Sequence, residues 1–321
     1  MKRLWIAPVL VLVALISWLA RPLPVHGLES RSHPSRDYAE ALARVAELAA
    51  GDSPAIAPEC RTLLLTHGHA TSRVIVLLHG LTNCPAQFDS IARLSFARGA
   101  NVFVPRLPRH GCSDRMTEEL GLLNAEELRE FTDRALDAAR GLGDSLTVAG
   151  LSVGGTLAAW AAVERHDVDR AVLIAPLFGV ALAPGPLTPI IGRLSALAPN
   201  FFMWWDPRAK ERIGGPQHVY PRFSTRSISA TIQIGAVTLE RARQTGAACR
   251  SLAVVTVGSD LAVDNGQSDG LVRACRERGG PKIETYRFPK ALGLNHDIVD
   301  PEQIGADPTL TYPVLMRYIG P

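Results

Sequence analysis

Short apolar runs alternate with amphipathic segments along most of this chain. Runs rich in aliphatic and β-branched residues predict strands at residues 61–66, 73–80, 101–105, 145–149, 170–175, 251–257 and 282–288. Apolar positions at helical spacing predict helices at residues 37–50, 85–98, 124–142, 154–165, 266–278 and 309–319. Because strands and helices alternate, the sequence predicts an α/β fold with a doubly wound, mostly parallel sheet.

One connection is too long for this alternation. About sixty residues, at about 176–234, separate two predicted core strands, and connections of this length are commonly lids or functional loops. We therefore predict a cap or lid insertion there. Its aromatic residues Trp204 and Trp205 are candidates for binding an apolar substrate, with the core of the cap itself as the alternative role.

The N-terminus has the pattern of a targeting segment. Lys2 and Arg3 precede the uncharged, mainly apolar residues 4–20, and Arg21 ends the run. Its length falls between the core of a signal peptide, about 7–15 residues, and a spanning helix of about 20. We predict that residues 1–27 are a signal peptide or signal anchor. Residues 28–58 would then form a linker and helix, and residues 59–321 a domain outside the cytoplasm, either exported or membrane-anchored.

The clearest chemical motif is Gly150-Leu151-Ser152-Val153-Gly154, which directly follows a predicted strand and begins a predicted helix. In this context G-x-S-x-G is typical of a nucleophile elbow, a sharp turn that exposes the serine hydroxyl. The flanking glycines suit such a turn because side chains there would crowd the crossing of strand and helix. A chance serine in a glycine-rich turn is the alternative interpretation.

Further motifs follow other predicted strands. They are Leu78-His79-Gly80-Leu81, Pro108-Arg109-His110-Gly111, Asp260-Leu261-Ala262-Val263 and Asn295-His296-Asp297. Together with the elbow, they resemble α/β-hydrolases of the esterase, lipase and serine-aminopeptidase type, from about Cys60 to the C-terminus. One departure is Arg109, where such families often have glycine. Within these motifs, His79 and His110 are expected to be structural.

The resemblance implies a serine hydrolase whose catalytic residues occur in the order nucleophile, acid, histidine. It implies Ser152 as the nucleophile, His296 as the base and Asp260 as the acid, with Asp264 in the same loop as the alternative acid. The oxyanion hole would consist of two backbone N–H groups, those of Leu81 and Val153.

The composition narrows the classes of molecule that the protein is expected to bind. The formal net charge is only +3 over 321 residues, and no basic cluster with interleaved aromatic residues occurs, so nucleic acid is not an expected partner. The chain contains no C-x-x-C, no H-E-x-x-H and no G-x-G-x-x-G after a strand. We therefore expect neither a metal ion nor another cofactor.

Five cysteines remain after the N-terminal run, and an odd number leaves at least one thiol unpaired in a monomer. A disulfide at Cys84 would brace the loop that follows His79, and Cys249 and Cys275 could also pair. The sequence does not decide the connectivity. Disulfides would agree with an exported protein.

These features together predict an exported serine hydrolase that cleaves small-molecule carboxylic esters through an acyl-enzyme. Membrane attachment is expected in the case where the N-terminal segment is an uncleaved signal anchor. One alternative is a serine peptidase or amidase with the same triad. Another is a non-catalytic hydrolase-like binding protein, which would be expected to have lost a triad residue.

Overall fold

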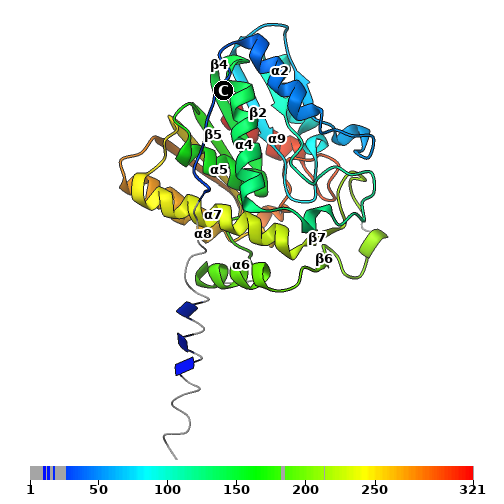
Figure 1. The fold of residues 1–321 in the computed structure, drawn as a ribbon, viewed down its shortest axis with the longest axis vertical. Coiled ribbons are helices and arrows are strands. Elements are labelled where there is room, and N and C mark those ends of the chain that lie inside the picture. The colour runs from blue at the N-terminus through cyan, green and yellow to red at the C-terminus, as the bar shows by residue number, and fades with distance from the viewer. Residues whose placement is uncertain are drawn as a thin grey trace, which may run out of the picture.

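A seven-stranded sheet forms the centre of the molecule (Figure 1). The computed structural model describes residues 10–11, 13–14, 17–18, 27–181, 185–212 and 214–320. In sheet order the strands are β1 (Leu63–Leu65), β3 (Asn101–Val104), β2 (Thr71–Leu78), β4 (Gly143–Leu151), β5 (Arg170–Ile174), β8 (Ser251–Val257) and β9 (Lys282–Phe288). Only β1 is antiparallel to its neighbour. The predicted α/β fold with a mostly parallel sheet is confirmed.

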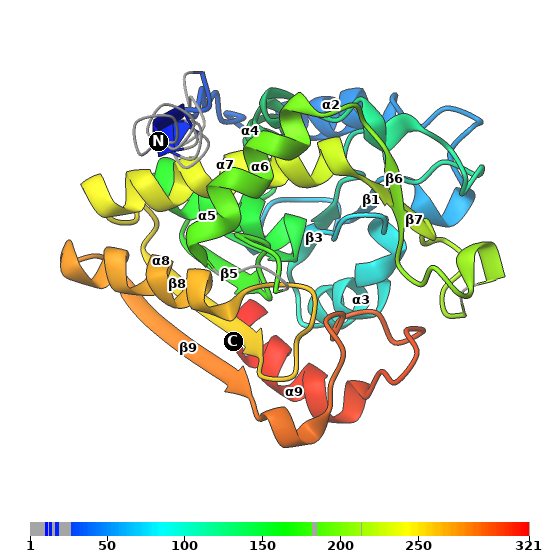
Figure 2. The ribbon, with the colours of Figure 1, turned by 90° about the horizontal axis from the view of Figure 1, so that it is seen from below.

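Helices cover both faces of the sheet, as Figure 2 shows. On one face lie α3 (Asp89–Ala97) and α9 (Pro308–Ile319). On the other face lie α4 (Ala125–Arg140), α5 (Val153–Glu164) and α7 (Thr225–Thr245). Helix α2 (Tyr38–Ala49) packs against α4, and α8 (Asn265–Glu277) packs against α7. The central strands are buried on both sides, which explains their continuous apolar sequences. Helix α5 is buried from Val153 to Val163, and its many small residues let it pack closely on the sheet.

The long connection between β5 and β8 has regular structure of its own. It contains α6 (Thr188–Leu197), a two-stranded antiparallel pair of β6 (Phe202–Trp204) and β7 (Arg222–Ser224), and then α7. Helix α7 packs on α5, and α6 packs on α7, where the Ser229 hydroxyl donates to the Gly192 carbonyl at 2.8 Å. We call residues 185–212 and 214–224 the outer segment, because α6 lies below α7, away from the sheet, and β6 and β7 lie at the lower right of the folded domain in Figure 1.

Of the five cysteines, two form a disulfide. Cys60 and Cys84 are bonded, so the predicted bridge at Cys84 is confirmed, and it ties the loop after β2 to the chain before β1. The predicted pairing of Cys249 with Cys275 is wrong, since both are buried free thiols. The Cys249 thiol instead donates to the Ser251 carbonyl at 3.4 Å. Burial raises the pKa of Cys249 to about 12 and that of Cys275 to about 11.

The predicted targeting segment, residues 1–27, lies largely outside the described residues. Among the residues that are described, no helix is both long enough and apolar enough to cross a membrane. Helix α2 begins where the sequence predicts, with the Asp37 carboxylate accepting the Glu40 N–H at its N-terminus.

Candidate active site

Ser152 occupies a sharp turn between β4 and α5. Its backbone is in a region that non-glycine residues rarely adopt, with φ 57° and ψ −114°. Two hydrogen bonds hold this conformation: the Ser152 N–H donates to the Ile174 carbonyl at 2.9 Å, and the Ser152 carbonyl accepts from the Leu177 N–H at 3.1 Å. Strain that is held in place in this way is typical of functional positions.

The glycines on either side of the turn have no room for a side chain. A Cβ on Gly154 would lie 1.9 Å from the Leu78 carbonyl oxygen, and one on Gly150 would lie 2.2 Å from the carbonyl oxygen of Gly154. The close approach of β4, α5 and β2 therefore requires the G-x-S-x-G pattern. This is the geometry of a nucleophile elbow.

Asp260 and His296 are joined by a hydrogen bond of 2.7 Å between Oδ2 and Nδ1. The Asp260 side chain is fully buried, and its second oxygen accepts the N–H groups of Ala262 at 2.8 Å and Val263 at 3.2 Å. Burial opposes ionisation of this carboxyl, but the hydrogen bond and charge of His296 outweigh burial and hold the pKa of Asp260 below its usual value. With Nδ1 engaged, Nε2 is the ring nitrogen left for a second partner.

Asp264, the alternative acid, has a different position. Its side chain accepts the Gly266 N–H at 2.9 Å and caps the N-terminus of α8. Aspartate is among the preferred residues for this role, so the cap accounts for its presence. The carboxylate bonded to His296 is that of Asp260.

The topology brings the three candidate triad residues to one edge of the sheet. Ser152 follows β4, Asp260 follows β8 and His296 comes after β9, and these strands are parallel members of the same sheet. Ligand sites of open α/β sheets lie at this carboxyl edge. Within the described residues, no hydrogen bond joins Ser152 to His296, and in unliganded enzymes such bonds are often long.

Two backbone N–H groups near Ser152 are available as donors. Within the described residues, neither the Leu81 nor the Val153 N–H has a hydrogen-bond acceptor. Val153 is the first residue of α5, where the N–H groups of a helix have no partner within the helix. Leu81 lies in the loop after β2, braced by the Cys60–Cys84 disulfide.

His79 holds this loop in place rather than facing the nucleophile. It is fully buried; Nδ1 is 3.0 Å from the Gly80 carbonyl oxygen, and Nε2 accepts the Leu107 N–H at 3.0 Å. Burial, together with the neighbouring His110, lowers the pKa of His79 well below its usual value. A neutral imidazole in two backbone hydrogen bonds fits the structural role expected for it.

The sequence did not single out Gln87, which links the two loops of the site. Its Oε1 accepts the Gly80 N–H at 2.7 Å, its Nε2 donates to Asp297 Oδ2 at 2.7 Å, and the residue is 2% exposed. Burial raises the pKa of the Asp297 carboxyl, which also accepts two backbone N–H groups of its own loop. Gln87 thus connects the loop of Leu81 to the loop of His296.

The outer segment contacts the Leu81 loop at Thr82. The Trp205 indole N–H donates to the Thr82 hydroxyl at 2.9 Å, and the Tyr220 N–H donates to the Thr82 carbonyl at 2.8 Å. The Trp205 ring packs on Phe223 with centroids 4.4 Å apart. Trp204, half-buried, is the last residue of β6, opposite Arg222 of β7. The structure thus brings Trp205 next to the candidate oxyanion loop, whereas Trp204 lies in the β6–β7 pair.

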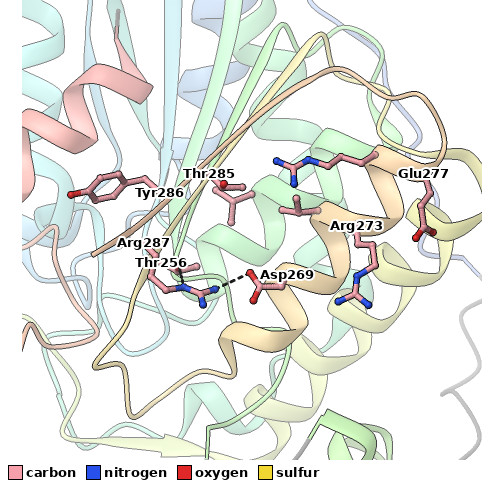
Figure 3. A pocket seen from close by; sticks show the side chains of 10 residues that line it. Thr256, Asp269, Arg273, Glu277, Thr285, Tyr286 and Arg287 are labelled. Atoms are coloured by element: carbon pink, nitrogen blue, oxygen red, sulfur yellow. Dashed lines mark hydrogen bonds and ion pairs between the residues drawn. The ribbon is translucent and has the colours of Figure 1, made fainter. Parts of the chain in front are cut away.

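Two hollows lie away from these residues. One of about 490 Å³, shown in Figure 3, lies between α8 and β9, where Arg287 pairs with Asp269 at 2.8 Å. Another of about 710 Å³ is lined by Arg106, Arg109 and Cys112 among others. Neither hollow is lined by Ser152, Asp260 or His296, so neither is the candidate active site.

The chain is similar to known proteins in sequence and in fold. Residues 75–292 match the alpha/beta hydrolase family. A pyrethroid hydrolase of Sphingobium wenxiniae is 34% identical over 116 residues, which cover 36% of this chain and 38% of that enzyme. The fold resembles a metagenome-derived lipolytic enzyme (TM-score 0.58, 21% identity, 75% of this chain and 94% of that one). It also resembles monoglyceride lipase of Saccharomyces cerevisiae (TM-score 0.57, 16% identity, 80% and 90%).

The family match covers more than half of the chain, and it includes the elbow and the residue proposed as the acid. The solved structures are too distant in sequence to show more than the fold. The protein belongs to the alpha/beta hydrolase family.

Proposed function

We propose that this protein is a serine hydrolase that cleaves small-molecule carboxylic esters through an acyl-enzyme. The observation that carries the proposal is the hydrogen bond between the buried Asp260 carboxylate and His296, at the sheet edge where Ser152 occupies an elbow. The lipolytic relatives support ester hydrolysis as the reaction class.

In the proposed mechanism, Ser152 Oγ attacks the ester carbonyl while His296 Nε2 accepts the hydroxyl proton. The carboxylate of Asp260 orients the imidazole and stabilises the imidazolium. The N–H groups of Leu81 and Val153 donate to the oxyanion, and one such donor contributes about 3 kcal/mol to transition-state stabilisation. His296 then protonates the leaving alcohol, and water activated by the same residue releases the acid.

The experiment that tests this function combines labelling with substrate comparison. We expect a fluorophosphonate to label one serine, Ser152, and p-nitrophenyl esters to be hydrolysed much faster than aminoacyl anilides. Preference for the anilides would favour the peptidase or amidase alternative. Absence of both labelling and turnover would favour a binding protein without catalysis.

We also propose that the catalytic domain acts outside the cytoplasm. The Cys60–Cys84 disulfide supports this location because structural disulfides persist in oxidising compartments, and so does the apolar run at residues 4–20. Fractionation of cells that express the full chain, with protease protection of each fraction, tests the proposal. A protease-protected, fully reduced protein in the cytoplasm would contradict it.

Gln87→Ala should lower kcat by about ten- to a hundredfold, because the bridge that fixes the Leu81 loop relative to the His296 loop is lost. KM should change little, since Gln87 is buried beneath the loops. Steady-state hydrolysis of p-nitrophenyl acetate measures both constants, and a thermal melt confirms that the variant is folded.

A paired exchange provides the control for Gln87. Gln87→Glu places two carboxylates against each other and should be as damaging as Gln87→Ala. In the double variant Gln87→Glu/Asp297→Asn, the new carboxylate can accept both the Gly80 N–H and the new amide. Recovery of kcat is expected, and a double variant no better than Gln87→Glu would contradict a positioning role.

Trp205 is expected to contribute in two separable ways. Trp205→Phe removes the indole donor to Thr82 and should lower kcat several-fold for esters of every acyl length. Trp205→Ala also removes the ring. It should lower kcat/KM for octanoyl esters by about a further 10- to 100-fold, and kcat/KM for acetyl esters by far less. Measurements with acetyl, butyryl and octanoyl p-nitrophenyl esters separate the two effects.

Trp204→Ala is the matched comparison, because Trp204 precedes Trp205 in the chain but belongs to the β6–β7 pair. If both tryptophans line the acyl pocket, Trp204→Ala should show the same dependence on chain length. A lower melting temperature with losses independent of chain length would instead place Trp204 in the core of the outer segment.

A further inference from the structure

The outer segment exposes an unusual number of large apolar side chains. Leu187, Leu194 and Leu197 are 44%, 49% and 63% exposed, and Phe201 and Met203 are 54% and 46% exposed. All five lie within seventeen residues of sequence, on α6 and β6 or directly beside them. Exposed apolar side chains that gather in one segment commonly mark a site of protein or membrane interaction.

The secondary structure places these side chains on outward faces. The three leucines are separated by seven and three residues, the spacing of one face of a helix. The opposite face of α6 packs on α7, where Ser229 bonds to Gly192. Phe201 and Met203 alternate with the less exposed Phe202, as expected along a strand. Figure 2 shows α6 and β6 on the same side of the molecule, nearer to the viewer than α7.

Exposed cations lie close to this apolar face along the chain. Arg208, Lys210 and Arg212 follow β6 directly, and Arg226 lies in the first turn of α7; all four are exposed. Within the described part of the chain, none of the four pairs with a carboxylate. An apolar face bordered by basic residues is the pattern of segments that lie in the interface of an anionic membrane.

The described residues of the apolar N-terminal run lie on the same side of the molecule. Trp18 belongs to this run, and its ring lies 4.8 Å from the guanidinium of Arg193 in α6. The described residues between Leu10 and Trp18 lie beyond α6, away from the sheet, in Figure 1. A membrane that received this run would therefore face α6.

We propose that the outer segment rests on an anionic lipid surface, with Leu194, Leu197, Phe201 and Met203 in the acyl boundary and the nearby cations at the headgroups. The N-terminal run and the apolar face would then engage the same surface. This orientation places the enzyme where apolar esters accumulate. The proposed contact does not depend on the chemistry assigned to Ser152.

Met203 provides a probe already present in the chain. Hydrogen peroxide oxidises an exposed methionine thioether to the sulfoxide. We expect vesicles of phosphatidylcholine and phosphatidylglycerol to slow the oxidation of Met203 in the full chain by about tenfold or more. Oxidation of Met116, half-buried outside the face, should be unchanged. Neutral phosphatidylcholine vesicles should protect Met203 less, and added salt should weaken the protection.

Two variants give matched controls. Leu194→Glu/Leu197→Glu should abolish the protection of Met203, whereas Leu94→Glu, which changes a leucine 41% exposed on α3, should preserve it. Both should hydrolyse p-nitrophenyl acetate at the wild-type rate, which shows that they are folded. If the wild-type chain fails to hydrolyse any ester but still shows vesicle protection, the proposed function fails and the lipid contact stands.

Two results would overturn the lipid contact. Met203 would be oxidised equally fast with and without vesicles if the face stays in water. Alternatively, Met203 would be protected without vesicles, increasingly at higher protein concentration, if a second copy of the chain covers the face.

Discussion

Ser152→Ala should lower kcat for p-nitrophenyl esters by about 10⁴- to 10⁶-fold and abolish labelling by a fluorophosphonate. The turn already has positive φ with a Cβ present, and the Ser152 hydroxyl makes no hydrogen bond within the described residues. Removing the hydroxyl should therefore leave the free energy of unfolding within about 0.5 kcal/mol of the wild type. Turnover, labelling and a thermal melt measure the three expectations.

Ser268→Ala is the matched control for this experiment. Its hydroxyl is also buried and has no hydrogen-bond partner within the described residues, but it lies on α8, outside the candidate site. It should keep wild-type activity and labelling. Near wild-type turnover by Ser152→Ala would remove Ser152 from the mechanism, whatever the control shows.

The sheet could be predicted from the sequence because its central strands are buried on both faces and so consist of apolar runs. Ser152 and Asp260 were also within reach as candidates, since each follows such a run, and His296 comes after the last strand, whose apolar and polar residues alternate. Parallel strands place their carboxyl ends at one edge, so the order of motifs along the chain implies their proximity in space. The sequence alone did not decide the acid, because Asp260 and Asp264 lie in the same loop. In the structure, the hydrogen bond to His296 is made by Asp260, and Asp264 caps α8.

The outer part of the molecule was harder to predict, and α7 shows why. Residues 225–245 are rich in serine, threonine and isoleucine, which have modest helix propensity. In the structure, Thr231 and Thr238 donate to carbonyls four residues earlier, and the helix packs on α5. Tertiary packing decided the conformation there, and no local pattern contains that information.

Long-range polar contacts were equally inaccessible. Gln87 and Asp297 are 210 residues apart in the chain, and a single glutamine two residues after Pro85 carries no signal of such a bridge. The same holds for the cysteines: the partner of Cys84 is Cys60, whereas Cys249 bonds to a nearby carbonyl instead of Cys275. Pairings of this kind follow from the fold and cannot be read from spacing.

Asp260→Asn should lower kcat by about 10⁴-fold, because an amide cannot both hold the Nδ1–H of His296 and stabilise the imidazolium. Asparagine also has only one acceptor oxygen, so it cannot accept the N–H groups of Ala262 and Val263 and the Nδ1–H of His296 with two separate oxygens, as aspartate does. Asp264→Asn is the matched control in the same loop. Asparagine is as good a helix cap as aspartate, so its activity and melting temperature should hardly change. Opposite results for the two variants would exchange their roles.

The effect of Asp260→Asn on stability should depend on pH in a defined direction. Because the folded-state pKa of Asp260 lies below its usual value, the ionised carboxylate of Asp260 stabilises the fold above the unfolded-state pKa of about 4. That stabilisation is lost as the pH falls through the lower folded-state pKa. The difference in melting temperature between wild type and Asp260→Asn should therefore stay constant from about pH 5 upward and shrink in more acidic solution. A difference that persists unchanged at low pH would mean that the carboxylate charge contributes nothing to holding His296.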